Sequence, residues 1–83
     1  MIIHSPQELA LYINEQRKKL KLSQQSVSEL VGLKQKTISG FENNPEQVKL
    51  ETLFRILSAL DLNLEISAKE NIVNPKKKWR EEW

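Results

Sequence analysis

A short run of polar residues between positions 34 and 39 has side chains suited to the edges of nucleic-acid bases. The run contains Lys34, Gln35, Lys36 and Ser39. A glutamine amide can form two hydrogen bonds with adenine, and a lysine ammonium group can donate to N7 and O6 of guanine. These residues fall at or near the start of a predicted helix, which is the end that enters the major groove when a helix reads duplex DNA. We therefore predict that these four side chains contact bases.

A second set of polar residues is placed to hold the phosphate backbone. Ser23 and Gln24 stand at the start of an earlier predicted helix, and Thr37 lies in the first turn of the later one. Hydroxyl and amide side chains bond phosphate oxygens, and the backbone amides of a helix start add to the attraction. We predict that these three residues contact phosphates.

Other kinds of chemistry are poorly supported. His4 is the sole histidine and cysteine is absent, so no zinc site of the usual His and Cys ligands can form. The sequence has neither a glycine-rich phosphate loop nor a hydrolase nucleophile motif. We interpret Glu29, Glu42 and Glu51 as surface ion-pair partners. The prediction is a protein that is not an enzyme and that has no cofactor and no metal.

The two polar sets require two short helices joined by a tight turn, a helix-turn-helix motif spanning residues 24–42. Ser23 caps the first helix, residues 24–31. Gly32 ends it, because glycine adopts the left-handed conformation at little cost. The second helix covers residues 35–42, where Gly40 either allows a close backbone approach or is merely tolerated. The apolar residues expected to hold the pair together are Val27, Leu30, Val31, Leu33, Ile38 and Phe41.

Two further helices frame the motif. Ser5 caps the first of them, Pro6 takes its first position and Glu8 completes a capping box. The last helix covers residues 50–60 and has a broad apolar stripe. We expect the whole stripe to be buried, namely Leu50, Leu53, Phe54, Leu57 and Leu60. Residues 1–60 are therefore predicted to be an all-α DNA-binding domain.

After this domain the apolar period changes from helical to alternating. Leu62, Leu64 and Ile66 alternate with polar residues, which is the pattern of a half-buried strand. A lone strand leaves its backbone groups unpaired and so needs a partner. We predict that residues 61–69 pair with the same segment of a second copy about a two-fold axis. The alternative is that this segment folds back on its own helices.

The composition changes again in residues 70–83. This segment is rich in lysine and cannot bury itself, so we predict a flexible tail. It also holds both tryptophans of the chain, Trp79 and Trp83. Tryptophan is enriched at the energetic centres of protein interfaces. We therefore predict that the tail is a recognition segment that becomes ordered on binding a protein partner.

The charge of the chain gives only local support for DNA binding. The net charge is +2, but residues 1–68 hold eight basic and eight acidic residues, and the excess lies in residues 69–83. Binding must therefore depend on local placement. Basic residues cluster just before the motif, at Arg17, Lys18, Lys19 and Lys21, and inside it, at Lys34 and Lys36.

The expected compartment is the cytoplasm, without membrane association. No apolar run approaches the roughly 20 residues that a membrane span needs. The first residues lack the pattern of a secretory signal. The absence of cysteine removes any disulfide framework.

From Ser5 to Leu60 the chain resembles the lambda-repressor-like (Cro/C1, XRE) helix-turn-helix domains. Gln24 and Gln35, eleven residues apart, match the paired glutamines of the phage repressors in that family. The resemblance implies that the first glutamine anchors the DNA backbone and that the second reads adenine. Ser28 departs from the alanine that is usual at its position. The implied fold is all-α, with four to five helices, one short C-terminal dimerisation strand and a flexible tail.

The chain is more similar still to the HipB-type antitoxins of HipA–HipB toxin–antitoxin systems. The segments that carry this resemblance include Lys34-Gln35, Thr37-Ile38-Ser39, Phe41-Glu42-Asn43-Asn44-Pro45 and the terminal Trp83, whereas residues 76–80 differ from the family. The resemblance implies a homodimer that binds an inverted-repeat operator and represses its own operon. It also implies that the protein neutralises a HipA-like Ser/Thr kinase toxin, on which Trp83 docks.

Two other functions stay open at this point. A plain repressor of the phage type would have the same motif but no toxin partner, and it would have no need of Trp83. An interaction module without DNA binding would bind random duplex with neither salt dependence nor sequence preference.

Overall fold

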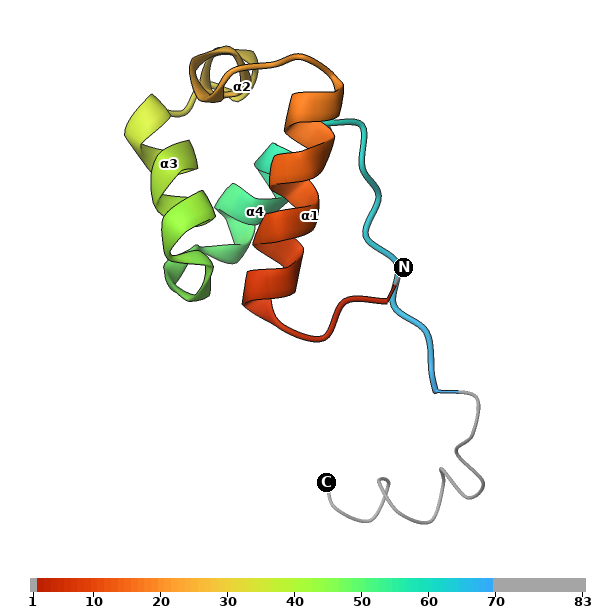
Figure 1. Cartoon of the computed structure of the whole chain (residues 1–83). Coiled ribbons are helices and arrows are strands. Elements are labelled where there is room, and N and C mark those ends of the chain that lie inside the picture. Colours follow the sequence, from red (N-terminus) through yellow and green to blue (C-terminus); the bar gives the residue numbers. More distant parts are fainter. Residues whose placement is uncertain (1, 70–83) are drawn as a thin grey trace.

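The computed structural model describes residues 2–69, which form four α-helices and one short 3₁₀ turn (Figure 1). The elements are α1 (Pro6–Lys19), α2 (Gln24–Val31), α3 (Gln35–Asn43), η1 (Pro45–Gln47) and α4 (Leu50–Ala59). Helix α2 packs against α3 and α4, while α1 packs against α3 and η1. The all-α prediction is confirmed, and the predicted helices have nearly their observed bounds. Within residues 2–69, none of the helices combines the length and the apolar character needed to cross a bilayer.

The predicted serine caps are present at the starts of α1 and α2. Ser5 Oγ accepts a hydrogen bond from the backbone N–H of Glu8 (3.1 Å), and Ser23 Oγ accepts one from the N–H of Ser26 (3.0 Å). The prediction of a capping box is wrong in one detail. The Glu8 carboxylate accepts from the N–H of His4 (2.7 Å), one residue before the cap, instead of from the cap itself. It therefore ties down the chain that leads into α1.

Helices α1, α2 and α4 all end in the same kind of turn. The residue at each stop has a positive φ, 61° at Lys21, 70° at Gly32 and 57° at Asp61. The leucine that follows donates its backbone N–H to the carbonyl five residues earlier, in the pairs Leu22–Arg17 (3.0 Å), Leu33–Ser28 (2.9 Å) and Leu62–Leu57 (2.9 Å). This combination is a Schellman motif. Each of the three leucines also packs against the core, so the turn both stops the helix and anchors the chain that follows.

The core receives side chains from all four helices. Its buried members are Ala10, Ile13, Val27, Ile38, Phe41, Leu53, Ile56, Leu57 and Leu60. Three residues predicted to be buried are instead exposed, with exposed fractions of 61% for Leu30, 67% for Leu50 and 49% for Phe54. The buried side of α4 also includes Ile56, so the apolar residues of this helix extend around more of its surface than the rest of the chain covers. Periodicity locates such a stripe but not the width that the neighbouring helices cover.

The segment after α4 has no regular secondary structure up to residue 69. Leu62 packs against the core, but Leu64 is 48% and Ile66 is 89% exposed. Figure 1 shows the segment leading away from the helices. It does not fold back on them beyond Leu62, which contradicts that alternative. Pairing with a second copy stays a prediction, and the predicted tail (residues 70–83, with Trp79 and Trp83) lies outside the described residues.

Candidate nucleic-acid interface

The two helices of the predicted motif are locked together by buried side chains. Val27 on α2 and Ile38 and Phe41 on α3 are at most 2% exposed. Ser28, which stands where the related domains have alanine, is also buried. Its Oγ donates to the carbonyl of Gln25 (2.7 Å), so its hydroxyl is satisfied within α2. The contact between α2 and α3 is therefore tight enough to fix where the start of α3 points.

The start of α3 presents polar side chains and uncapped backbone amides to solvent. Lys34 takes the cap position with an extended backbone, and its side chain makes no capping hydrogen bond. The first N–H groups of a helix have no partner within the helix, so such an end suits an anion. Gln35 and Lys36 follow directly and are exposed. Of the four predicted base contacts, three thus lie together at this end.

The fourth predicted base contact, Ser39, lies one helical turn further along α3. It is half-buried, and its Oγ accepts a hydrogen bond from Asn43 Nδ2 (3.4 Å). Gly40 beside it is exposed, and a Cβ added there would meet no atom within 4 Å. The protein itself therefore gives no reason for a glycine at that position.

The three residues predicted to contact phosphates differ in their exposure and in the hydrogen bonds that they already make within the protein. Ser23 is exposed, but its Oγ is used in the α2 cap and lies 3.0 Å from Ser26 Oγ. Thr37 is half-buried in the first turn of α3. Gln24 is half-buried, and its Oε1 accepts a hydrogen bond from Gln35 Nε2 (3.4 Å). The structure therefore brings the two predicted glutamines into contact.

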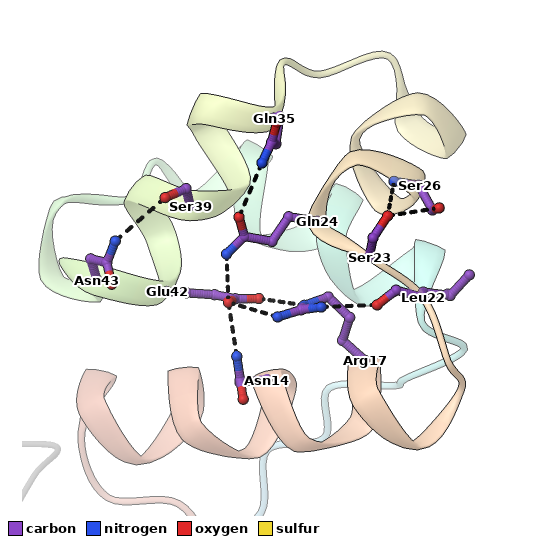
Figure 2. A network of polar contacts seen from close by, with 10 residues as sticks. All are labelled: Asn14, Arg17, Leu22, Ser23, Gln24, Ser26, Gln35, Ser39, Glu42 and Asn43. Carbon is purple, nitrogen blue, oxygen red and sulfur yellow. Dashed lines mark hydrogen bonds and ion pairs between the residues drawn. The ribbon is translucent and has the colours of Figure 1, made fainter.

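A polar network behind these glutamines centres on Glu42 at the end of α3 (Figure 2). Glu42 Oε1 accepts hydrogen bonds from Gln24 Nε2 (2.9 Å), Asn14 Nδ2 (2.8 Å) and Arg17 Nη2 (3.2 Å). Its Oε2 accepts from Arg17 Nε (2.8 Å). Arg17 Nη1 also donates to the carbonyl of Leu22 (2.9 Å). One carboxylate thus joins α1, α2 and α3.

The network is well shielded from water and its charges are paired. The side chains of Arg17 and Glu42 are only 11% and 8% exposed. Burial alone would raise the pKa of Glu42. The hydrogen bonds from Arg17, Gln24 and Asn14, together with the positive charge of Arg17, outweigh burial and lower that pKa below its ordinary value. Among the residues described, every buried side-chain nitrogen and oxygen has a hydrogen-bond partner.

Two sequence-based interpretations of these residues are wrong. Arg17 was grouped with the basic residues before the motif, but its guanidinium is occupied by Glu42 and Leu22 and faces inward. The interpretation of Glu42 as a surface carboxylate is wrong, because its side chain is only 8% exposed and is the centre of the buried network. Glu51 is the kind of partner that was expected, since it forms an exposed ion pair with Arg55 (3.3 Å).

The face of α1 carried a signal that could have revealed the network. Asn14 and Arg17 each follow a core residue, Ala10 and Ile13, by four positions, which places all four on one side of the helix. A polar pair on a buried face needs a buried partner. No three metal-binding side chains gather anywhere in the part of the chain that the structure describes.

Comparison with known proteins gives one consistent result. The helix-turn-helix family model matches residues 13–66. Over 69 residues the chain is 38% identical to the antitoxin HipB of Escherichia coli, which corresponds to 83% of this chain and 78% of that protein. Two solved structures, a HipA–HipB–O2–O3 complex and a HipB–O4 20mer complex, each contain a chain with 36% identity and a TM-score of 0.81. Each match covers 84% of this chain and 99% of the HipB chain in that structure.

Proposed function

The chain belongs to the helix-turn-helix family of HipB-type antitoxins, and from that premise we propose that it is both a DNA-binding repressor and an antitoxin. As a homodimer it binds an inverted-repeat operator through the major groove and represses its own operon. It also binds and neutralises a HipA-like Ser/Thr kinase toxin. The observation that carries the proposal is the exposed polar start of α3, on a fold shared with HipB in a HipB–O4 20mer complex.

In this proposal the exposed start of α3 reads the bases. Gln35 pairs with an adenine through N6 and N7, and Lys34 and Lys36 donate to guanine edges beside it. Ser39, one turn further on, contacts the next accessible base. The exposure of Gln35 and both lysines supports this assignment, since none of them is held in the core.

The phosphate contacts fix the position of α3 in the groove. A glutamine amide has two N–H groups, and Gln24 uses one of them on Glu42. The other is available for a phosphate oxygen. Ser23 and Thr37, at the starts of α2 and α3, add hydroxyl contacts close to backbone amides that favour an anion.

The dimer is proposed to close through the segment after α4. Leu62, Leu64 and Ile66 would pair with the same residues of the second copy, and the exposure of Leu64 and Ile66 supports this arrangement. A two-fold dimer presents two copies of α3 to two half-sites of an inverted repeat.

The DNA-binding half of the proposal is tested with a duplex that spans the region directly upstream of the chain's own gene. We expect binding at least about a thousandfold tighter than to a scrambled duplex of the same length. Replacing Gln35 with alanine should reduce this ratio by about tenfold and leave the affinity for the scrambled duplex unchanged. An equal loss on both duplexes would make Gln35 a phosphate contact. If the unaltered protein shows no preference, it is not a repressor of that site.

The toxin-binding half follows from the likeness to HipB in a HipA–HipB–O2–O3 complex. We propose that Trp83 docks on the kinase. Deleting Trp83 should weaken the toxin complex in calorimetry and leave operator binding unchanged. Unchanged toxin affinity without Trp83 contradicts this assignment.

The rival function is that of a plain repressor. The absence of any kinase-like reading frame beside the gene would favour it. Both functions place the protein in the cytoplasm, where its operator and a kinase toxin would be found.

A further inference from the structure

We propose that Glu42 is a positioning residue for base recognition, because its carboxylate sets the direction of a hydrogen-bond chain that runs through Gln24 to Gln35 (Figure 2). The chain of bonds determines which way the Gln35 amide faces the DNA. This inference deepens the proposed function, and it rests on the proposal that Gln35 reads a base.

The three residues lie on two helices and form one continuous line. Gln24 at the start of α2 donates from Nε2 to Glu42 Oε1 at 2.9 Å. Gln35 at the start of α3 donates from Nε2 to Gln24 Oε1 at 3.4 Å. Glu42 is nearly buried at the far end of α3, while Gln35 is exposed at the near end. The line therefore connects the buried interior with the surface that faces the groove.

The direction of the line follows from the chemistry of its buried end. An ionised carboxylate can only accept hydrogen bonds, whereas an amide can donate from one side and accept on the other. Gln24 must therefore turn its nitrogen toward Glu42, which leaves its oxygen facing Gln35. Gln35 must in turn direct its nitrogen toward Gln24. The Gln35 oxygen then lies on the opposite side of the amide group.

The direction matters because adenine is read by an ordered pair of groups. The N7 atom accepts a hydrogen bond and the N6 amino group donates one, so the glutamine must place its nitrogen and its oxygen in the matching order. In the reversed amide the oxygen would meet N7, and both are acceptors. Fixing the amide before DNA arrives therefore favours adenine at one position of the site.

Glu42 is well suited to hold this direction. Arg17 donates to both of its oxygens, and Asn14 donates to Oε1 (2.8 Å), so the carboxylate is fixed by groups on α1 as well. Its lowered pKa keeps it ionised, and hence acceptor-only, at neutral pH. If Glu42 only held α1 against α3, its hydrogen bonds with Arg17 and Asn14 would be enough. The additional hydrogen bond from Gln24 is not required for that structural role.

The test is a selection of preferred sites from a pool of random-sequence duplexes, followed by sequencing. The position read by Gln35 is the one whose preference disappears in Gln35→Ala. We expect Glu42→Gln to reduce the base preference at that same position from about tenfold or more to about threefold or less. The reason is that a glutamine at 42 can donate as well as accept hydrogen bonds and so no longer fixes the direction of the Gln24 amide. Glu29→Gln is the matched control, since this carboxylate also accepts a hydrogen bond from a glutamine on α2 (Gln25 Nε2, 3.0 Å) but lies outside the chain of bonds, and the variant should keep the preference.

A second variant covers the case in which Glu42→Gln does not fold. Gln24→Ala breaks the chain while leaving the Arg17–Glu42 pair intact, and it should lose the same preference along with a uniform loss of affinity. If either folded variant keeps the preference at the Gln35 position, or if Gln35→Ala alters no position, the inference is overturned. If the unaltered protein selects no sequence from the pool, the proposed DNA-binding function itself has failed, which is a distinct result.

Discussion

The Glu42 network and the outer face of α4 differ in whether a single chain provides all the contacts that their side chains need. In the network, the buried charges of Arg17 and Glu42 are paired, and the polar groups around them are hydrogen-bonded. On the outer face, Leu50 and Phe54 are left 67% and 49% exposed, and Ile66 beyond the helix is 89% exposed. The first region is complete within a single protomer, and the second is not.

This difference separates recognition from association. The Gln35 amide, which is proposed to read a base, is held through Gln24 by a bond that exists before DNA binds, so little ordering of this side chain is needed on binding. Large exposed apolar side chains become favourable only when a partner removes them from water. Breaking each region should therefore have different consequences, and the following predictions are arranged from the largest expected effect to the smallest.

Removing the carboxylate at the centre of the network should have the largest effect on stability. Glu42→Ala leaves Arg17 almost buried without its counter-charge, and we expect a loss of about 3 kcal/mol in the free energy of unfolding. The matched control is Glu51→Ala, which breaks an exposed pair with Arg55 and should change stability by less than about 0.5 kcal/mol. Urea denaturation measures both. Equal losses in the two variants would mean that shielding from water adds nothing to the network.

Changing the outer face of α4 should act on association instead of folding. Phe54→Ser removes a half-exposed aromatic side chain, and we expect the dissociation constant of the homodimer to rise by at least about tenfold. Leu11→Ser is the control, because Leu11 is 59% exposed on α1. Sedimentation equilibrium gives both constants. If the two variants dissociate to the same extent, the exposed face of α4 is not part of the dimer interface.

The pH dependence of stability should isolate the charge of Glu42. Because its pKa is lowered in the folded state, the carboxylate contributes stability that is fully present above its ordinary value of 4.5 and is lost as the pH falls through the folded value. The difference in stability between the unaltered protein and Glu42→Gln should therefore be constant from pH 7 to about pH 5.5 and should shrink below pH 4.5. Thermal unfolding at a series of pH values tests this, and a difference that grows on acidification has the wrong sign.

The left-handed turns should give the smallest effects. Lys21 has a φ of 61°, which disfavours any residue with a Cβ, so Lys21→Gly should stabilise the protein by about 0.5 kcal/mol. Gly32→Ala, at a φ of 70°, should destabilise it by about 1 kcal/mol. The corresponding shifts in Tm are a few degrees in opposite directions. Shifts of the same sign would show that the turns are not governed by the strain of a positive φ.

Sequence was most informative where the deciding interactions are local. The serine caps, the stop at Gly32 and the register of Val27, Ile38 and Phe41 depend on residues a few positions apart, and all were predicted. The alternating pattern after Asp61 predicts a strand, but a strand depends on a partner that no single sequence can supply.

The failures involve contacts between distant parts of the chain. Glu42 meets Asn14 and Gln24 across 28 and 18 positions, and although the pattern of α1 indicates a buried polar pair, no local pattern identifies Glu42 as its partner. The exposed edges of the α4 stripe were missed for the same reason, since coverage depends on where the other helices end. The contact between Gln24 and Gln35, in contrast, can be predicted from the sequence, because the turn between their helices is short and its geometry is fixed.

The three turns that end α1, α2 and α4 also have a kinetic consequence. Each is closed by a backbone bond that spans only five residues, so a helix can stop at its proper length before any other helix has docked. The search for the native state then consists of assembling short segments whose ends are already defined. Proteins dominated by such local contacts fold in microseconds to milliseconds. We expect this chain to recover its DNA-reading surface on that timescale each time it unfolds.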